Sequence, residues 1–236
     1  MSVGLVAQRR MRFYTKTAAS RLPRHAAYTG NVPPLIKTVI FDLGNVVIPF
    51  DIHRGYAALQ PYCRHSPAEI ASLVRATGIV PQFDAGQMSP QDFVRRFSEA
   101  LGLDIGYQRF CELWNGIFLP GEIVPESLLA ALHRRYRLLA LSNTNAIHFA
   151  TVRKKYPILK HFDDCVLSFE VGAAKPDPRI YQAALARAGC SPNECFFTDD
   201  VPSYVEAAKR AGMEAVQFES VPQLEQAMEA LGIDWR

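Results

Sequence analysis

The chain has 236 residues, of which 49% are hydrophobic and 21% charged, which fits one globular α/β domain with or without a small insertion and excludes disorder throughout. The net charge of +3 is too small to indicate nucleic acid as a partner, and no apolar run is long enough to span a membrane. The five cysteines are scattered without a C-x-x-C pair, which is typical of free thiols in a reducing compartment and gives no zinc site.

Residues 1–33 form a basic N-terminal extension that we expect to be disordered. The first acidic residue in the chain is Asp42, and the extension is rich in Arg, Ser, Thr and Ala. This composition resembles an organellar transit peptide. Two other interpretations are a plain tail and a start of translation at Met11. The predicted location is cytoplasmic, or organellar if the extension is a transit peptide.

The segment after the extension predicts a buried strand followed by a group of helices. Residues 36–41 form a short β-rich run that reads as a strand. Residues 51–119 show helical periods and little strand pattern. Ser66 and Ser89 are each followed by Pro and stand where helix N-caps are expected. We therefore predict a small helical cap at 51–119, inserted into a core that comprises 34–50 and 120–236.

From residue 124 onward, helical and strand patterns alternate. Helices are predicted at 124–135, 146–155, 178–188, 202–211 and 221–231, and strands at 138–142, 165–168, 195–198 and 215–218. Alternation of this kind implies a parallel sheet with helices on both faces. The predicted fold is α/β, a doubly wound Rossmann-like parallel sheet with the inserted helical cap.

Polar residues follow four of the predicted strands. They are Asp42, Ser142-Asn143, Lys175 and Asp199-Asp200. Because the carboxyl ends of parallel strands meet at one edge of the sheet, we expect one crevice with three carboxylates, an amine and a hydroxyl. Three carboxylates require positive charge nearby, which Lys175 supplies in part. Carboxylate and carbonyl oxygens suit Mg²⁺, and helix N-termini add donors for an anion.

Four segments around these residues resemble, in order, the four motifs of the haloacid dehalogenase superfamily. They are Val39–Val46, Leu141–Asn143, Lys175–Asp177 and Phe197–Asp200, and the similarity spans about residues 36–218. Phe83–Gly86 resembles a cap pattern of the same superfamily. The sequence from Asp42 to Val46 is similar to the first motif of bacterial α-D-glucose-1-phosphate phosphatases.

The resemblance implies a role for each residue of the crevice. Asp42 would be the nucleophile and form an aspartyl-phosphate that water hydrolyses. The cofactor would be Mg²⁺. Ser142-Asn143 and Lys175 would bind the phosphoryl group, and Lys175 would also steady the nucleophile. The metal ligands would be Asp42, the backbone carbonyl of Gly44, Asp199 and Asp200.

Gly44 departs from the superfamily pattern. Most phosphatases of the superfamily carry an Asp there, which protonates the leaving oxygen, and such catalysis is worth about 10²–10⁴ in rate. Three interpretations remain open: a better leaving group such as the anomeric oxygen of a sugar 1-phosphate, a proton from another group such as His53 or from the substrate, or poor catalysis with phosphate binding retained.

The sequence thus predicts a Mg²⁺-dependent phosphatase of small phosphorylated metabolites, with sugar phosphates as the expected class and a monomer or homodimer as the expected assembly. One alternative is a catalytically weak phosphate- or metabolite-binding protein. The other is a 2-haloacid dehalogenase, in which a halide leaves without protonation, although such enzymes have an aromatic residue in place of Gly44. Candidate cap contacts to the substrate are Arg54, Arg75, Gln87, Arg95 and Trp114.

Overall fold

The computed structural model of the chain describes residues 35–236. The predictions of a disordered extension, a transit peptide or a start at Met11 therefore lie outside the described residues. In the described part, no helix combines the length and the apolar character that crossing a bilayer requires.

The centre of the fold is a five-stranded parallel sheet with the strand order β3-β2-β1-β4-β5. Strand β1 pairs with β2 on one side and with β4 on the other, so that Thr38 lies opposite Arg137 in β2 and opposite Cys195 in β4. The chain fills one half of the sheet from β1 to β3 and then crosses to the other side of β1, so the order reverses beside β1. The strands are β1 (Thr38–Phe41), β2 (Arg137–Ser142), β3 (Asp164–Leu167), β4 (Cys195–Asp199) and β5 (Glu214–Gln217).

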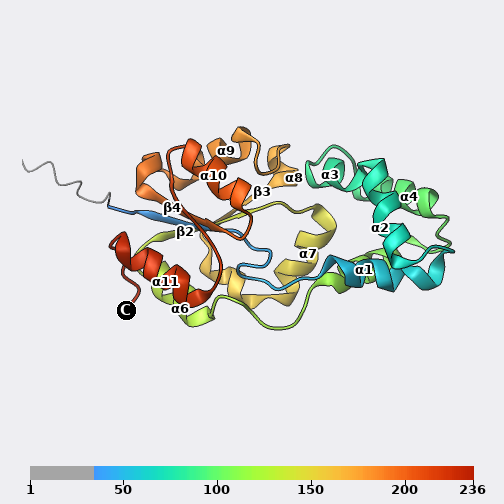
Figure 1. The fold of residues 1–236 in the computed structure, drawn as a ribbon, viewed down its shortest axis with the longest axis horizontal. Helices are drawn as coiled ribbons and strands as arrows, with labels where there is room; N and C mark the ends of the chain where they lie inside the picture. Colours follow the sequence, from blue (N-terminus) through green and yellow to red (C-terminus); the bar gives the residue numbers. More distant parts are fainter. Residues whose placement is uncertain (1–34) are drawn as a thin grey trace, which may run out of the picture. The chain divides into compact units, whose positions relative to one another are not determined.

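Helices cover both faces of the sheet, which confirms the predicted doubly wound α/β fold (Figure 1). Side chains of β1 alternate between the two layers: Val39 and Phe41 belong to one hydrophobic cluster, and Ile40 belongs to the other. The first cluster includes side chains of α6 (Glu126–His133), α7 (Ala146–Lys155) and α11 (Val221–Ala230). The second includes side chains of α9 (Pro178–Ala188) and α10 (Pro202–Arg210).

The segment between β1 and β2 is helical and packs around its own aromatic cluster. The rings of Phe83 and Phe93 stack with centroids 4.2 Å apart, and Trp114 is fully buried beside them. Its helices are α1 (Ile52–Leu59), α2 (Pro67–Thr77), α3 (Ile79–Asp84), α4 (Pro90–Leu101) and α5 (Tyr107–Trp114). We call α1–α5 the insertion; its role as a separate cap domain at 51–119 stays a prediction.

Local sequence explains where the helices of the insertion begin. The Ser66 hydroxyl accepts a bond from the Glu69 backbone N–H, while the Glu69 carboxylate accepts one from the Ser66 N–H, which makes a capping box before α2. Ser89 caps α4 through the backbone N–H of Asp92. Both side chains satisfy backbone donors that the first helical turn leaves unpaired.

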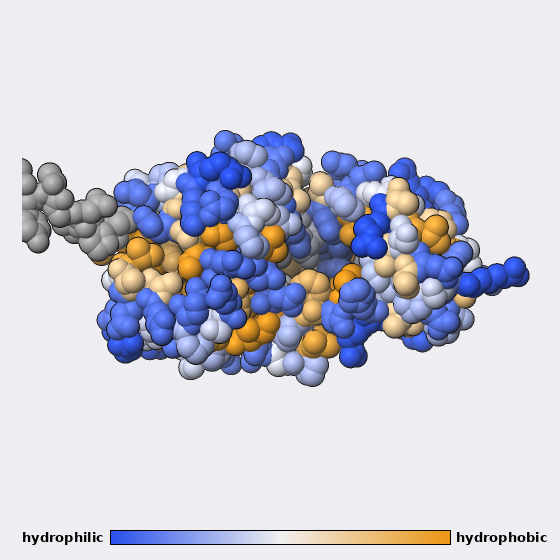
Figure 2. Space-filling view, in the orientation of Figure 1, coloured by the Kyte–Doolittle hydropathy of each residue, from blue (hydrophilic) through white to orange (hydrophobic). Residues whose placement is uncertain are grey.

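Short elements fill most of the remaining connections. The strand predicted at 165–168 ends at Leu167 because Ser168 begins the short helix α8 (Ser168–Val171). Within residues 35–236, four 3₁₀ helices lie at Gln60–Tyr62, Asn115–Ile117, Pro157–His161 and Pro192–Glu194. On the face of the molecule shown in Figure 2, hydrophobic residues appear in separate groups among hydrophilic ones.

Candidate active site

The carboxylates that follow β1 and β4 lie together at the carboxyl edge of the sheet. Asp42 comes directly after β1, and its backbone N–H donates to the Thr198 carbonyl of β4 at 2.9 Å. Asp199 is the last residue of β4, and Asp200 is the next in the chain. One carboxylate oxygen from each of Asp42, Asp199 and Asp200 lies within 4.8 Å of the others. The structure therefore brings together the three acids that the sequence placed at separate strand ends.

Lys175 supplies positive charge inside this cluster. The residue is 3% exposed. Its Nζ donates to Asp42 Oδ1 at 2.8 Å, to Asp199 Oδ2 at 2.5 Å and to the Leu141 carbonyl at 3.0 Å. All three protons of the ammonium thus have acceptors, and two of them are carboxylates.

Asn143 fixes the backbone of Lys175. Its Oδ1 accepts from the Lys175 N–H at 2.7 Å, and its Nδ2 donates to the Lys175 carbonyl at 3.0 Å. Both polar atoms of the amide are therefore bonded to the loop that carries the lysine. The prediction that Asn143 binds the phosphoryl group stays a prediction, while its contacts make it a positioning residue for Lys175.

Burial and charge shift the acidity of these groups. Burial raises the pKa of Asp42 to about 7; the Lys175 charge opposes this shift and the Asp199 charge adds to it. Burial also raises the pKa of Asp200, with Asp199 again adding. For Lys175, burial lowers the pKa, but the charges of Asp42 and Asp199 outweigh burial and raise it above its usual value.

The charge balance and the donor types of the site fit a divalent metal ion. One ammonium faces three carboxylates, so the cluster carries an excess of negative charge when all three are ionised. Three hard oxygen donors within reach of one another are the ligand type that Mg²⁺ prefers, with water and phosphate oxygens completing its shell. A divalent cation would offset the repulsion from Asp199, which adds to burial in raising the pKa of Asp42 and Asp200.

Gly44 lies in the turn after Asp42, against an aromatic side chain. In this turn the Ile48 N–H donates to the Leu43 carbonyl at 2.7 Å, and Asn45 adopts a positive φ of 54°. A Cβ atom added to Gly44 would lie 2.7 Å from Cε1 of Phe50. The ring of Phe50 therefore occupies the space into which a side chain at position 44 would extend.

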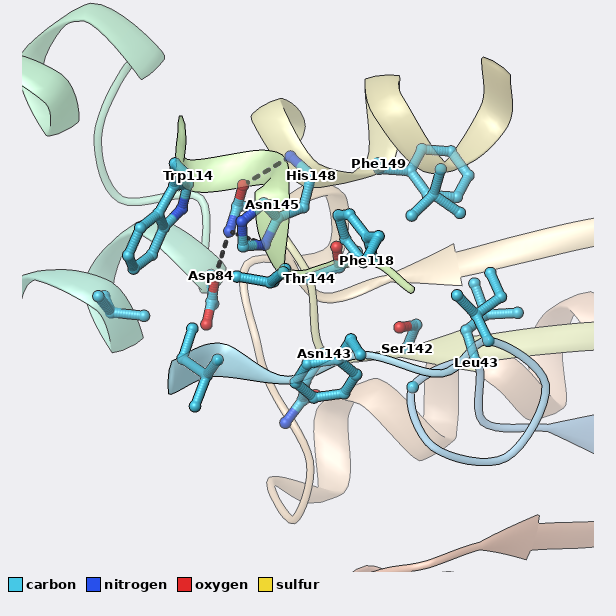
Figure 3. Close-up of a pocket in the computed structure, with 17 residues that line it drawn as sticks. Leu43, Asp84, Trp114, Phe118, Ser142, Asn143, Thr144, Asn145, His148 and Phe149 are labelled. Atoms are coloured by element: carbon cyan, nitrogen blue, oxygen red, sulfur yellow. Dashed lines mark hydrogen bonds between the residues drawn. The ribbon is translucent and has the colours of Figure 1, made fainter. Parts of the chain in front are cut away.

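A cavity of about 170 Å³ begins at Gly44 and Ser142 and extends to the insertion (Figure 3). Ser142 ends β2, is buried, and lies on the cavity wall. Trp114 is on the wall as well. The other four cap residues named from the sequence, Arg54, Arg75, Gln87 and Arg95, do not line this cavity. His53 is exposed on α1 and does not line it either, which argues against His53 as the proton donor.

Polar side chains from the insertion and from the start of α7 line one end of the cavity. Asn145 Nδ2 donates to Asp84 Oδ1 at 2.8 Å, and Asn145 Oδ1 accepts from the His148 N–H at 3.0 Å as the N-cap of α7 (Figure 3). The His148 ring stacks on Trp114 at 5.5 Å between centroids. Burial raises the pKa of Asp84 to about 6 and lowers that of His148 to about 4.

Sequence reasoning did not identify Asn145 or His148, and it noted Asp84 only as part of a cap pattern. The Asn145 position carries a signal in the sequence, because Asn is a favoured N-cap and stands directly before the predicted helix at 146–155. The contact between Asp84 and Asn145 joins residues 61 apart, and no local pattern indicates it.

Comparison with known proteins identifies the family. Residues 36–212 match the family model described as haloacid dehalogenase-like hydrolase. The chain belongs to this family. It is therefore a hydrolase by family, which confirms the resemblance seen in the four motifs.

Relatives and solved structures of this family cover most of the chain. The D-ribitol-5-phosphate phosphatase of Bacteroides thetaiotaomicron is 25% identical over 213 residues, which are 86% of this chain and 96% of that one. The phosphoserine phosphatase of Thermus thermophilus is 37% identical over 171 residues, 69% of this chain and 64% of that one. A haloacid dehalogenase family enzyme from Bacteroides thetaiotaomicron, solved in complex with magnesium and inorganic phosphate, superposes with a TM-score of 0.71 at 28% identity, covering 79% of this chain and 96% of that one.

Proposed function

We propose that this hydrolase is a Mg²⁺-dependent phosphatase that cleaves phosphate monoesters of small metabolites through an aspartyl-phosphate on Asp42. The observation that carries the proposal is the cluster of three carboxylates, in which Lys175 bridges the two buried ones, Asp42 and Asp199. The names of the relatives and the magnesium–phosphate complex of the structural neighbour support it.

The proposed metal ligands are the carboxylates of Asp42, Asp199 and Asp200 and the backbone carbonyl of Gly44. When bound, Mg²⁺ would neutralise charge on the transferred phosphoryl group. The three carboxylates come from β1 and β4, which are hydrogen-bonded neighbours, so the sheet holds them in register.

In the first step, a carboxylate oxygen of Asp42 attacks phosphorus and the bond from phosphorus to the ester oxygen breaks. The ester oxygen leaves with its electron pair and gains a proton to become the alcohol. In the second step, water attacks phosphorus and the bond to the Asp42 oxygen breaks, which frees phosphate and regenerates the carboxylate.

The remaining residues bind and orient. Ser142 would donate its hydroxyl proton to a phosphoryl oxygen. Lys175 would stabilise the ionised form of Asp42 and fix its rotamer, since it already bonds to Asp42 Oδ1. Asn143 would hold Lys175 in place through its two backbone contacts.

The insertion would act as the cap over this site, with residues 51–119 as the cap and 34–50 plus 120–236 as the core. The shared cavity supports this division, because its walls include both strand ends and side chains of α1, α3 and α5. Closure of a cap excludes water and adds contacts to the leaving group. Sugar phosphates stay one candidate class, supported by relatives named for D-ribitol 5-phosphate and for phosphorylated carbohydrates.

The test is phosphate release from a panel of monoesters, with Mg²⁺ and with EDTA, by the wild-type protein and Asp42→Asn. We expect Mg²⁺-dependent release by the wild type and a fall of several orders of magnitude in the variant, because an amide is a poor nucleophile. Release that does not depend on Asp42 would contradict the mechanism. Binding of phosphate without turnover would favour the binding-protein alternative, and metal-independent halide release from 2-chloropropionate would favour the dehalogenase.

A further inference from the structure

The cavity that begins at Gly44 and Ser142 is lined mainly by hydrocarbon. Cavity walls are formed by side chains from the turn after β1, from the insertion and from the segment that leads out of it. Phe50, Ile52, Val80, Trp114, Ile117 and Phe118 are among them. Three of these six are aromatic, and they surround a volume of about 170 Å³. An apolar protein cavity of about 150 Å³ is known to hold benzene, so this space fits a single six-membered ring.

Most polar atoms on the cavity wall already have partners within the protein. The Asn143 amide is bonded to the backbone of Lys175, and the Asn145 amide to Asp84 and the His148 N–H. The Thr144 N–H donates to Ser168 Oγ. Among the described residues, Trp114 Nε1 and His148 Nε2 are buried atoms of wall residues without a hydrogen-bond partner. Most of the lining residues are hydrocarbon, so a polyol would place some of its hydroxyl groups against side chains that cannot bond them.

The position of the missing acid is apolar as well. The Phe50 ring covers Gly44, so it stands where a proton donor beside the nucleophile would lie. A hydroxyl group that is buried against hydrocarbon without a hydrogen bond weakens binding, and a leaving oxygen without a nearby acid departs slowly unless its own pKa is low. Both effects disfavour a polyhydroxylated alkoxide and favour an apolar ring whose hydroxyl is acidic.

From these contacts we propose that the leaving group of the substrate is a compact, mainly apolar body the size of one ring, such as a small aryl hydroxyl. The proposal rests on the proposed phosphatase function and specifies its substrate class. The ring packs against Phe50, Trp114 and Phe118, while Ser142 on the cavity wall holds the phosphoryl group. At the far end, Asp84 accepts one hydrogen bond from a substituent of the ring.

Four phosphomonoesters separate polarity from leaving-group acidity. Benzyl phosphate and D-ribitol 5-phosphate both release a primary alkoxide, but the first leaving group is apolar and the second is polar. Phenyl phosphate has an apolar leaving group that is more acidic. D-glucose 1-phosphate has a leaving group that is both acidic and polar. With Mg²⁺, we expect kcat/KM for benzyl phosphate to exceed that for D-ribitol 5-phosphate at least tenfold, an order-of-magnitude expectation for mismatched polar groups. Phenyl phosphate should exceed both benzyl phosphate and D-glucose 1-phosphate. Equal or faster turnover of the polyol would overturn the inference and leave the phosphatase function intact.

A binding measurement keeps the inference testable if turnover fails. Calorimetry with Asp42→Asn and Mg²⁺ compares benzyl phosphate with D-ribitol 5-phosphate without hydrolysis. Tighter binding of the benzyl ester supports the inference even if the wild type hydrolyses no ester. A lack of hydrolysis would refute only the phosphatase function. Equal binding, or tighter binding of the polyol, would refute the inference.

A pair of variants at Phe50 tests the wall itself. Phe50 is partly exposed, and its side chain can change without removing a fully buried ring. Phe50→Leu keeps a hydrocarbon wall and should keep the preference for benzyl over ribitol ester. Phe50→Asn should reduce that preference at least about tenfold, since a polar group then meets the ring. Thermal unfolding checks that both variants fold, and an unchanged preference in folded Phe50→Asn would overturn the role of this wall.

Discussion

The substitution Gly86→Ala adds one methyl group, which should push the insertion away from the core. Gly86 follows α3 and adopts a positive φ of 66°. A Cβ atom there would lie 2.1 Å from the backbone carbonyl oxygen of Phe169 in α8, and real Cβ atoms essentially never come closer than 3.0 Å to such an atom. The glycine therefore lets the backbone of the insertion contact the backbone of the core directly.

Gly102 provides a matched control for Gly86→Ala. Its φ is 64°, and nothing lies within 4 Å of an added Cβ. An L-residue in the left-handed region costs about 1–2 kcal/mol, so Gly86→Ala and Gly102→Ala should share this loss of stability. Only Gly86→Ala must also move the Phe169 contact from 2.1 Å to at least 3.0 Å. Such a shift moves α3, whose Val80 lines the cavity, relative to the strand ends.

The assay combines urea unfolding with Mg²⁺-dependent phosphate release from phenyl phosphate. Gly102→Ala should lose about 1–2 kcal/mol of unfolding free energy and keep its kcat/KM. Gly86→Ala should lose more stability, and its kcat/KM should fall about 10–100-fold, because misplacement by about 1 Å costs up to that factor. Equal losses of stability in both variants, with activity unchanged in both, would refute the contact between the insertion and α8 as a determinant of the site.

Three further predictions follow from buried groups. Lys175→Met should abolish turnover and lower the unfolding free energy at pH 7 by about 3–5 kcal/mol, because it leaves two buried carboxylates unpaired. Burial raises the pKa of Asp84 from 3.8 to about 6, so the folded protein binds this proton more tightly than the unfolded chain does. The stabilisation that results is complete below about pH 4 and is lost as the pH rises through about 6. Asp84→Asn should remove this loss and be more stable than the wild type at pH 7, by about 3 kcal/mol at most; the opposite contribution of His148 is present in both proteins. Gly44→Asp should reduce activity through its clash with Phe50, whereas Gly44→Asp combined with Phe50→Ala should raise kcat/KM for benzyl phosphate more than for phenyl phosphate.

Each of these predictions has a control and a contrary result. For Lys175, the control is Lys209→Met, which breaks only an exposed pair with Glu206 and should cost less than about 1 kcal/mol; similar costs for both lysines would contradict the buried ion pair. Parallel pH–stability curves for the wild type and Asp84→Asn would show that burial does not shift Asp84. Faster alkyl ester hydrolysis by Gly44→Asp alone would show that Phe50 does not block that position.

Local patterns were sufficient to predict the sheet and its helices. Short β-rich runs indicated the strands, and caps such as Ser66 and Ser89 indicated helix starts within a residue or two. The family membership followed from the order of four short motifs, and the match over residues 36–212 confirmed it. Short helices such as α8 were not predicted, because four residues carry too little periodic signal to identify a helix.

The sequence by itself determined which residues meet at the sheet edge. Asp42 and Asp200 directly follow strands and Asp199 ends one. Parallel strands bring their carboxyl ends to one side, so the convergence of these residues needed no knowledge of packing. The sequence also indicated that a cation such as Lys175 would lie near these acids, because a cluster of carboxylates requires positive charge nearby.

Only the tertiary structure decided what surrounds that cluster. The Phe50 ring over Gly44, the direct contact of Gly86 with Phe169, and the bond from Asn145 to Asp84 join residues whose spacing in the chain carries no period. These contacts depend on how the insertion packs against the core, and packing is set by the shapes of whole surfaces rather than by local sequence. The acidic cluster is therefore predictable from the sequence, while the cavity that begins at Gly44 and Ser142 exists only in the folded chain.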